Sequence, residues 1–244
     1  LLRKNLFVRF LDILLKGYGQ VLICLHPVTG LLVILAIFYV STEIGGLTLL
    51  GILASTLTAF LIRVRRLHLY GGVYGFNGVI LAVAWPWFLK LNAVSVVLLI
   101  WAACLSSFLM KFLSHLSSRT KLNVPIFSVP AVFLIWGIVA ALKAFPPARN
   151  LLGPDVRIEE YLYVFADRFA YLGAHFTWEM FFATFNQHLG AAALILLGIC
   201  VHSRISALFA AVALIATLLT LGLGRSAELA ALELYLYNTV PCAI

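Results

Sequence analysis

Four polar side chains stand out in an otherwise apolar chain, and their spacing repeats. Two of them, Gln20 and Glu179, could form hydrogen bonds with a solute, whereas we expect Asn77 and Asn238 to belong to a structural motif. Asn77 and Asn238 are 161 positions apart, and Gln20 and Glu179 are 159 positions apart. Side-chain amide and carboxylate oxygens accept hydrogen bonds from N–H donors. Because internal repeats in membrane chains place a transport path at the repeat interface, this pattern predicts such a path.

Glu179 is the acidic residue that we expect at membrane depth, where a carboxylate is costly and indicates function. Its repeat partner, Gln20, is neutral. A proton relay would use two acids or an acid–histidine pair, whereas a Gln/Glu pair suits two oxygens that accept N–H donors from a solute. A proton-coupled transporter that uses Glu179, and a helix cap near the membrane surface, both stay as alternatives for this residue.

The other reactive residue types show no pattern of a metal or catalytic site. The four cysteines all lie in apolar stretches, and no pair has metal-ligand spacing. His26, His175 and His188 lack the i, i+4 spacing of a zinc-binding helix. We therefore expect no metal, no cofactor and no enzymatic activity.

The composition is that of an integral membrane protein. Of the 244 residues, 64% are hydrophobic and 11% are charged, whereas a soluble domain has roughly 25% charged residues. A membrane-spanning helix needs about 20 residues, so the chain has room for roughly eight or nine. We expect an all-α membrane protein, and its lack of long loops favours a bacterial inner membrane.

The net charge of +8 is concentrated in groups that apolar stretches separate, at 3–16, 63–66 and 111–121. Basic residues on the cytoplasmic side of spanning helices produce this pattern, which argues against a nucleic-acid-binding face. We therefore place the N-terminus in the cytoplasm. The first half then has five crossings, and inverted symmetry between two halves requires an odd number.

The apolar pattern divides the chain into a first half over 1–143, an extracytoplasmic linker over 144–168 and a second half over 169–244. We expect apolar helical segments in the first half, interrupted by breaks, at 5–25, 31–40, 47–62, 78–89, 94–114 and 131–142.

The breaks include a polar turn over 41–46, a glycine-rich stretch over 71–78, and a segment between Pro125 and Pro130. In hydrocarbon, irregular backbone survives only where protein or a water-filled path surrounds it. Helix ends at that depth expose N–H and C=O dipoles that suit a neutral polar solute. Close helix packing through the glycines is the alternative.

Aromatic residues are expected in two roles. Phe76 and Tyr237 directly precede the repeated asparagines. They would lie at matching depths in the two halves, where they could form a slot for a flat molecule; ordinary aromatic packing is the alternative. Trp85 and Trp87 flank Pro86, and we expect them to be anchors at the membrane interface.

Three ordered motifs resemble those of the urea transporter family. The first is Gly-Tyr-Gly-Gln-Val, which ends at Val21 and is followed by His-Pro-Val-Thr-Gly at 26–30. The second is Tyr-Gly-Phe-Asn-Gly at 74–78, and the third is the proline-flanked segment with Ser128. The resemblance covers nearly the whole chain. It implies two inverted five-helix halves, each with a half-spanning tilted helix, and a pore through each protomer of a homotrimer.

The resemblance also implies passive, channel-like permeation of urea, with short amides or ammonia as alternative solutes. Gln20 and Glu179 would be paired oxygens at helix ends, Phe76 and Ile80 would line one wall, and Ser128 would replace a central threonine.

The chain departs from the family pattern at Ile23, three residues after Gln20, and at Met180, which follows Glu179. These two side chains would then help to set the width of the slot. The chain begins without Met and ends at Ile244 as a helix is starting. We therefore expect further C-terminal helices, and a partner of Ser128, beyond Ile244.

Overall fold

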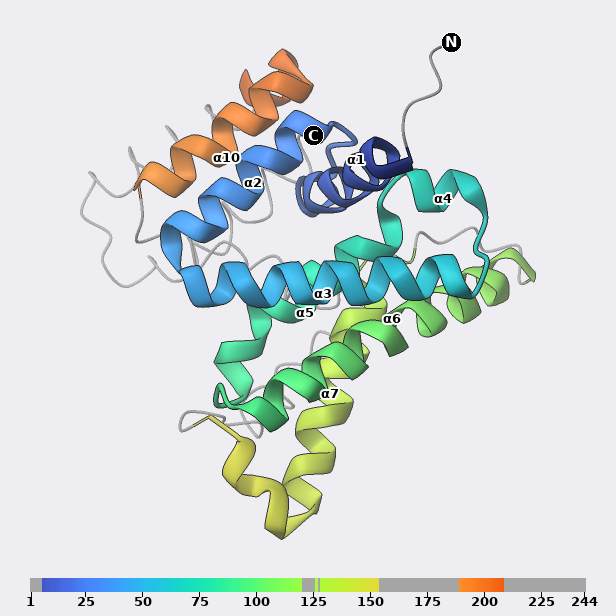
Figure 1. The fold of residues 1–244 in the computed structure, drawn as a ribbon, viewed down its shortest axis with the longest axis vertical. Coiled ribbons are helices and arrows are strands. Elements are labelled where there is room, and N and C mark those ends of the chain that lie inside the picture. The colour runs from blue at the N-terminus through green and yellow to red at the C-terminus, as the bar shows by residue number, and fades with distance from the viewer. Residues whose placement is uncertain (1–5, 120–125, 127, 154–188, 209–244) are drawn as a thin grey trace, which may run out of the picture.

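The structure is a computed structural model that describes residues 6–119, 126, 128–153 and 189–208. Every regular element named in this part of the chain is a helix (Figure 1), which confirms the all-α prediction: α1 (Leu6–Gly19), η1 (Gln20–Leu22), α2 (Pro27–Val40), α3 (Thr42–Leu61), α4 (Arg66–Tyr70), α5 (Val73–Phe88), α6 (Ala93–Arg119), α7 (Val129–Ala144), η2 (Pro146–Leu151) and α10 (Leu189–His202). A single antiparallel bridge joins Leu89 to Leu152.

Helices α3 and α6 are long and apolar enough to cross a membrane. The described residues contain a third candidate span if the segment Leu6–Leu22 and helix α2 count as one span, broken by a bend of 73°. Helices α5, α7 and part of α10 are apolar but shorter. The prediction of an integral membrane protein is confirmed, whereas the number of crossings stays a prediction.

Two predicted breaks are smaller than expected. The turn predicted over 41–46 is the single residue Ser41, whose Oγ accepts a hydrogen bond of 3.3 Å from the Ile44 N–H and so caps α3. One capping serine is enough to start a helix. The glycine-rich break ends at Gly72, which has a φ of +73°, and Gly75 is already inside α5. Such a positive φ favours glycine because it has no Cβ.

Helix α5 is the centre of the described structure. Every residue from Tyr74 to Trp85 is buried, and α1, α3, α6 and α7 all pack against it; Figure 1 shows it passing behind α3. With 16 residues it is ~24 Å long, shorter than the ~30 Å hydrocarbon core. The half-spanning helix that the resemblance implies stays a prediction.

The prediction that Trp85 is an interfacial anchor is wrong. Its side chain is fully buried, and its indole Nε1 donates a hydrogen bond of 2.7 Å to the Oγ of Ser95, which is buried as well. A buried indole N–H needs such a partner. Trp87, by contrast, is 48% exposed, so an anchoring role stays possible only for that residue.

The Trp85–Ser95 bond gives a first testable prediction. Replacing Ser95 with alanine should lower the free energy of unfolding by about 1–2 kcal/mol, because the indole N–H would stay buried without an acceptor. Thermal unfolding in a mild detergent measures this loss. Ser118→Ala is the matched control, because Ser118 is exposed and bonds only a carbonyl of its own helix. Equal effects of the two substitutions would contradict the prediction.

Candidate functional site

The first polar landmark, Gln20, lies where the chain breaks between α1 and α2. Ile23 adopts a left-handed conformation with a φ of +57°, and its N–H donates to the Gln20 carbonyl at 2.9 Å. His26 then caps α2, its Nδ1 accepting from the Val28 N–H at 3.3 Å, and Pro27 begins the helix. Proline at the first helical position needs no N–H partner. The helical segment predicted over 5–25 therefore ends early, because η1 stops at Leu22, and the next helix begins at Pro27.

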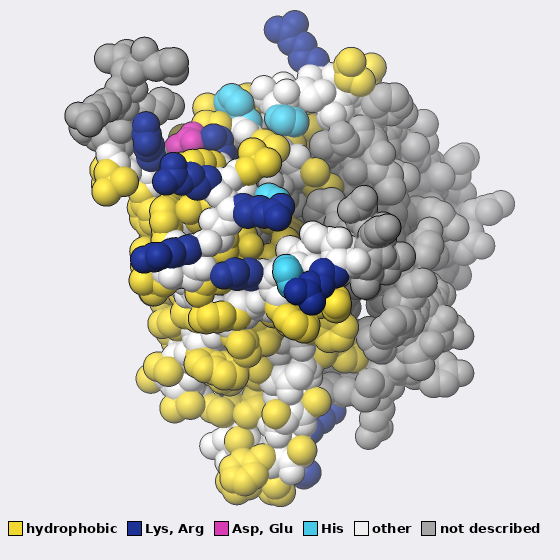
Figure 2. Space-filling model, turned by 90° about the vertical axis from the view of Figure 1, so that its right-hand side faces the viewer, with side chains coloured by type: hydrophobic (Ala, Val, Ile, Leu, Met, Phe, Trp, Pro, Cys, Tyr) yellow, Lys and Arg dark blue, Asp and Glu magenta, His cyan; other side chains and the backbone are white. Residues whose placement is uncertain are grey.

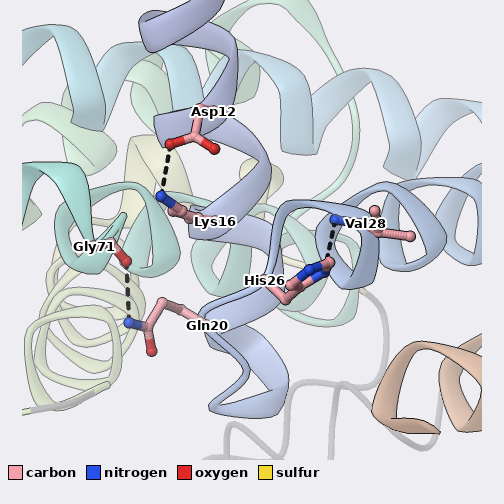
Figure 3. A network of polar contacts seen from close by, with 6 residues as sticks. All are labelled: Asp12, Lys16, Gln20, His26, Val28 and Gly71. Atoms are coloured by element: carbon pink, nitrogen blue, oxygen red, sulfur yellow. Dashed lines mark hydrogen bonds and ion pairs between the residues drawn. The ribbon is translucent and has the colours of Figure 1, made fainter. Parts of the chain in front are cut away.

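The Gln20 side chain is held in one orientation by the protein. Its Nε2 donates a hydrogen bond of 3.0 Å to the carbonyl of Gly71, in the loop before α5. Figure 3 shows the amide oxygen directed away from Gly71. Within the described residues, no hydrogen bond uses this oxygen. The side chain is half-buried, so the site offers a fixed acceptor, as the interpretation of Gln20 requires.

Lys16, in α1 one turn before Gln20, forms an ion pair with Asp12 on the same helix. The Nζ of Lys16 lies 2.6 Å from an Asp12 carboxylate oxygen, and Figure 3 shows the pair above Gln20. An i, i+4 pair of opposite charge stabilises a helix by roughly 0.2–0.5 kcal/mol. Asp12 is thus paired with a cation on its own helix.

Asn77 connects α5 to the start of α7. Its side chain is fully buried, and its Oδ1 accepts a hydrogen bond of 3.3 Å from the Ala131 N–H, in the first turn of α7. The first N–H groups of a helix lack partners within the helix. Asn77, on the neighbouring helix α5, therefore supplies a hydrogen-bond acceptor for one of these N–H groups, which supports its interpretation as a structural residue.

The same contact positions Ser128, the N-cap residue of α7, which is buried. The Ser128 carbonyl accepts from the Val132 N–H at 3.1 Å, and Pro130 lies in the first turn of the helix. The start of α7 is thus buried in the protein next to α5. A helix N-terminus placed in this way presents partial positive charge to its surroundings.

The apolar wall predicted at Phe76 and Ile80 lies on α5. These residues are four positions apart, so they project from one face of the helix. Both are buried, in the same hydrophobic cluster as Val21 and Leu22 of η1. Ile23 differs from them, because it is 38% exposed. The structure thus places Gln20, Phe76 and Ile80 on two elements that are in contact, η1 and α5.

Five of the predicted residues lie outside the described residues: Pro125, Glu179, Met180, Tyr237 and Asn238. The repeat between the two halves is therefore a prediction that this structure does not test. One link to the second half is described: the Thr29 hydroxyl donates a hydrogen bond of 2.8 Å to the Gly198 carbonyl. It joins α2 to α10, which lie side by side in Figure 1.

Sequence reasoning missed Gly71 as part of the site, although it singled out the glycine-rich stretch. The contribution of Gly71 is its carbonyl, which orients Gln20. A backbone acceptor leaves no mark in the residue type. The available signal was the end of a short helix, where carbonyl groups lack partners within the helix.

The fold and the site define a helical membrane protein with buried polar groups at helix breaks. Residues 11–244 match the family model described as urea transporter. The chain belongs to the urea transporter family, which confirms the resemblance found in its motifs and the expectation of a transport protein rather than an enzyme.

A curated relative is urea transporter 1 of Mus musculus, which is 25% identical to this chain over 138 residues. The aligned part is 52% of this chain and 33% of the mouse protein. The chain thus matches about a third of the length of that relative.

Proposed function

We propose that this protein lets urea cross a membrane passively, through a path that includes Gln20, Phe76, Ile80 and Ser128. Membership of the urea transporter family supports the choice of solute. The observation that supports the path is the Gln20 side chain, whose nitrogen donates to the Gly71 carbonyl while no described residue donates to its oxygen. A fixed acceptor at a broken helix is what a solute with N–H groups needs.

Urea fits such a path because it is planar, neutral and rich in N–H donors. Apolar walls from Phe76 and Ile80 would pack against the flat faces of urea, while a row of oxygen atoms would accept hydrogen bonds from the N–H groups at its edge. An ion would lose its hydration shell there without equivalent ligands, and this desolvation cost excludes ions. Passive permeation needs no coupling to an ion gradient.

The complete path uses residues outside the described part of the chain. We propose that Glu179 pairs with Gln20, that Tyr237 faces Phe76, and that Ile23 and Met180 set the width of the slot. Asn238 would repeat the structural role of Asn77.

The proposed assembly is a homotrimer of protomers with inverted halves over 1–143 and 169–244, joined by an extracytoplasmic linker over 144–168. Pro125 would lie in the break before α7. The predicted bracket at Pro130 is too late, because α7 begins at Val129 and includes Pro130. We place the trimer in a bacterial inner membrane with its N-terminus in the cytoplasm.

The test uses the full-length protein in liposomes, with urea entry followed by stopped-flow light scattering. We expect wild-type flux far above that of empty liposomes and insensitive to a pH gradient. Ser128→Val should reduce the flux by about tenfold or more, because a lost hydrogen bond to a buried group costs about 1–3 kcal/mol. A threonine side chain has nearly the same size as valine but keeps the hydroxyl of serine, so Ser128→Thr should retain most of the flux.

The other outcomes separate the alternatives. Urea flux equal to that of empty liposomes would refute the proposal. If the protein raised the entry of acetamide or ammonia over that into empty liposomes by a larger factor than the entry of urea, the same path would be assigned to short amides or ammonia. Uptake driven by a pH gradient, and lost in Glu179→Gln, would instead make Glu179 a coupling residue. Equal losses in Ser128→Val and Ser128→Thr would mean that bulk, not the hydroxyl, matters at this position.

A further inference from the structure

A cavity in the described part of the chain has a strongly basic lining. Its volume is about 220 Å³, and it lies where α3 ends, α4 begins and α6 passes. The lining includes three cationic side chains, two imidazoles and a phenol, from Arg63, Arg65, Lys111, His68, His115 and Tyr74. Small-molecule pockets usually measure about 300–1,000 Å³, so this cavity suits a small charged group.

The backbone at the cavity is held by the turn that ends α3. Arg63 has a left-handed φ of +50°. Its N–H donates to the Phe60 carbonyl at 3.1 Å, and the Val64 N–H donates to the Ala59 carbonyl at 3.3 Å. These bonds satisfy carbonyls that a helix end would otherwise leave free. The backbone that carries Arg63 and Arg65 is therefore fixed without a ligand.

Lys111 of α6 forms a hydrogen bond with the turn that ends α3. Its Nζ donates a hydrogen bond of 2.8 Å to the Ile62 carbonyl, which follows the last residue of α3. A cation at a helix C-terminus is favourable because the carbonyls there carry partial negative charge. The carbonyl offsets part of the Lys111 charge, but no such acceptor is provided for Arg63 and Arg65 by the described residues.

None of the described residues that line the cavity is acidic. The acidic residues in the described ranges are Asp12 and Glu43. Asp12 is already paired with Lys16 at 2.6 Å. Glu43 lies in the first turn of α3, so it is ~27 Å from the other end of that helix at 1.5 Å per residue. The positive charge at the cavity is therefore not balanced by the described protein.

The cavity lies at the end of α3, which is one of two helices in the described residues that are long and apolar enough to cross a membrane. We therefore expect the cavity near the membrane surface. Figure 2 shows Lys, Arg and His side chains gathered in the upper half of this face, above a mainly hydrophobic region. Phosphate groups of phospholipids lie at this level.

We propose that this cavity binds the phosphate group of an anionic ligand. An arginine guanidinium presents parallel N–H donors that match two oxygens of a phosphate, and Tyr74 adds an O–H donor to the lining. The phosphate could belong to a phospholipid headgroup or to a small soluble phosphate. The positive-inside tendency alone would require basic residues here, but it would not require a cavity or the fork geometry of arginine.

The test measures the stabilisation of the full-length protein in a neutral detergent by tryptophan fluorescence during heating. One arm adds phosphatidylglycerol, with zwitterionic phosphatidylcholine of the same acyl chains for comparison. The other arm adds sodium phosphate, with sodium chloride at equal ionic strength. The double variant Arg63→Gln/Arg65→Gln removes two charges from the cavity. Lys90→Gln/Lys143→Gln removes two charges elsewhere and is the matched control.

We expect the anionic ligand to raise the unfolding temperature of the wild-type protein and of the control. The cavity variant should need about tenfold more ligand for the same shift, because charge-assisted hydrogen bonds contribute strongly to binding. Arg63→Lys/Arg65→Lys keeps the charge but loses the parallel N–H donors of arginine. Its response to the ligand should therefore lie between those of the wild-type protein and of Arg63→Gln/Arg65→Gln. A response to phosphatidylglycerol alone identifies a lipid headgroup, and a response to inorganic phosphate as well identifies a soluble phosphate.

Three results would overturn the proposal. The first is no shift with either ligand in the wild-type protein. The second is an equal loss of response in the cavity variant and the control, which would indicate a general surface charge effect. The third is a full response in Arg63→Gln/Arg65→Gln with normal unfolding in the absence of ligand.

Discussion

Replacing Gly78 with alanine should lower the free energy of unfolding by about 2–3 kcal/mol, within the range seen when extra atoms are forced into packed interiors. Gly78 lies in α5, and its backbone is in direct contact with that of Gly51 in α3. An added Cβ would overlap the Gly51 carbonyl oxygen and the Ser55 hydroxyl oxygen. Because the obstacle includes backbone, the helices would have to separate.

The measurement is unfolding in detergent or mixed micelles, followed by tryptophan fluorescence. Gly46→Ala is the matched control, because Gly46 lies in α3 and a Cβ there would meet no atom within 4 Å. Alanine is favoured over glycine inside a helix by roughly 0.5–1 kcal/mol, so the control should be slightly stabilised. A Gly78→Ala protein as stable as Gly46→Ala would show that α3 and α5 do not pack through these glycines.

The contact between Gly51 and Gly78 also bears on the alternative considered for the glycine-rich stretch. In membranes, small residues let helix backbones approach closely and gain dispersion contacts. For Gly78 this packing role is what the structure describes. Gly71 and Gly72 belong to the break itself, since Gly71 supplies a carbonyl to Gln20 and Gly72 has a positive φ. One stretch of sequence therefore has both roles, divided at the start of α5.

Local sequence signals predicted that the helices are interrupted, but they predicted the lengths of these interruptions less well. Pro27 begins a new helix where the predicted first segment stops, but the break opens earlier than predicted, at the left-handed residue Ile23 inside the segment predicted over 5–25. The turn predicted over 41–46 was too long, because glycines inside a helix resemble a turn in sequence. In the structure Gly45 lies against the Phe38 ring, so a tertiary contact holds a helix where local propensity is weak.

Contacts between distant residues could not be predicted from residue type. The Gln20 nitrogen bonds a carbonyl 51 positions away, and the Trp85 indole bonds Ser95 on the next helix. The sequence identified Gln20 as polar and placed Trp85 at a membrane interface because tryptophan is common there. Only the packing of helices shows that Gln20 is oriented by Gly71 and that Trp85 is buried.

Replacing Asn77 with leucine should both destabilise the protein and impair permeation. The Asn77 oxygen is the acceptor for the buried Ala131 N–H. Leucine has a similar size but no acceptor, so the N–H would be left unpaired at a cost of about 1–3 kcal/mol. The start of α7 would shift or fray, and Ser128 would move with it. Urea flux at 25 °C should therefore fall several-fold even in the fraction of protein that stays folded.

The control for this prediction is Asn92→Leu. The Asn92 oxygen accepts a hydrogen bond of 2.8 Å from the Ser95 N–H and caps α6, but Asn92 is exposed. Loss of an N-cap costs about 0.5–2 kcal/mol, so the two variants should lose comparable stability. Only Asn77→Leu should lose urea flux per folded protein, because only Asn77 holds the helix that begins at Ser128. If both variants lost flux in proportion to their stability, Asn77 would be a stabilising residue without a role in positioning the path.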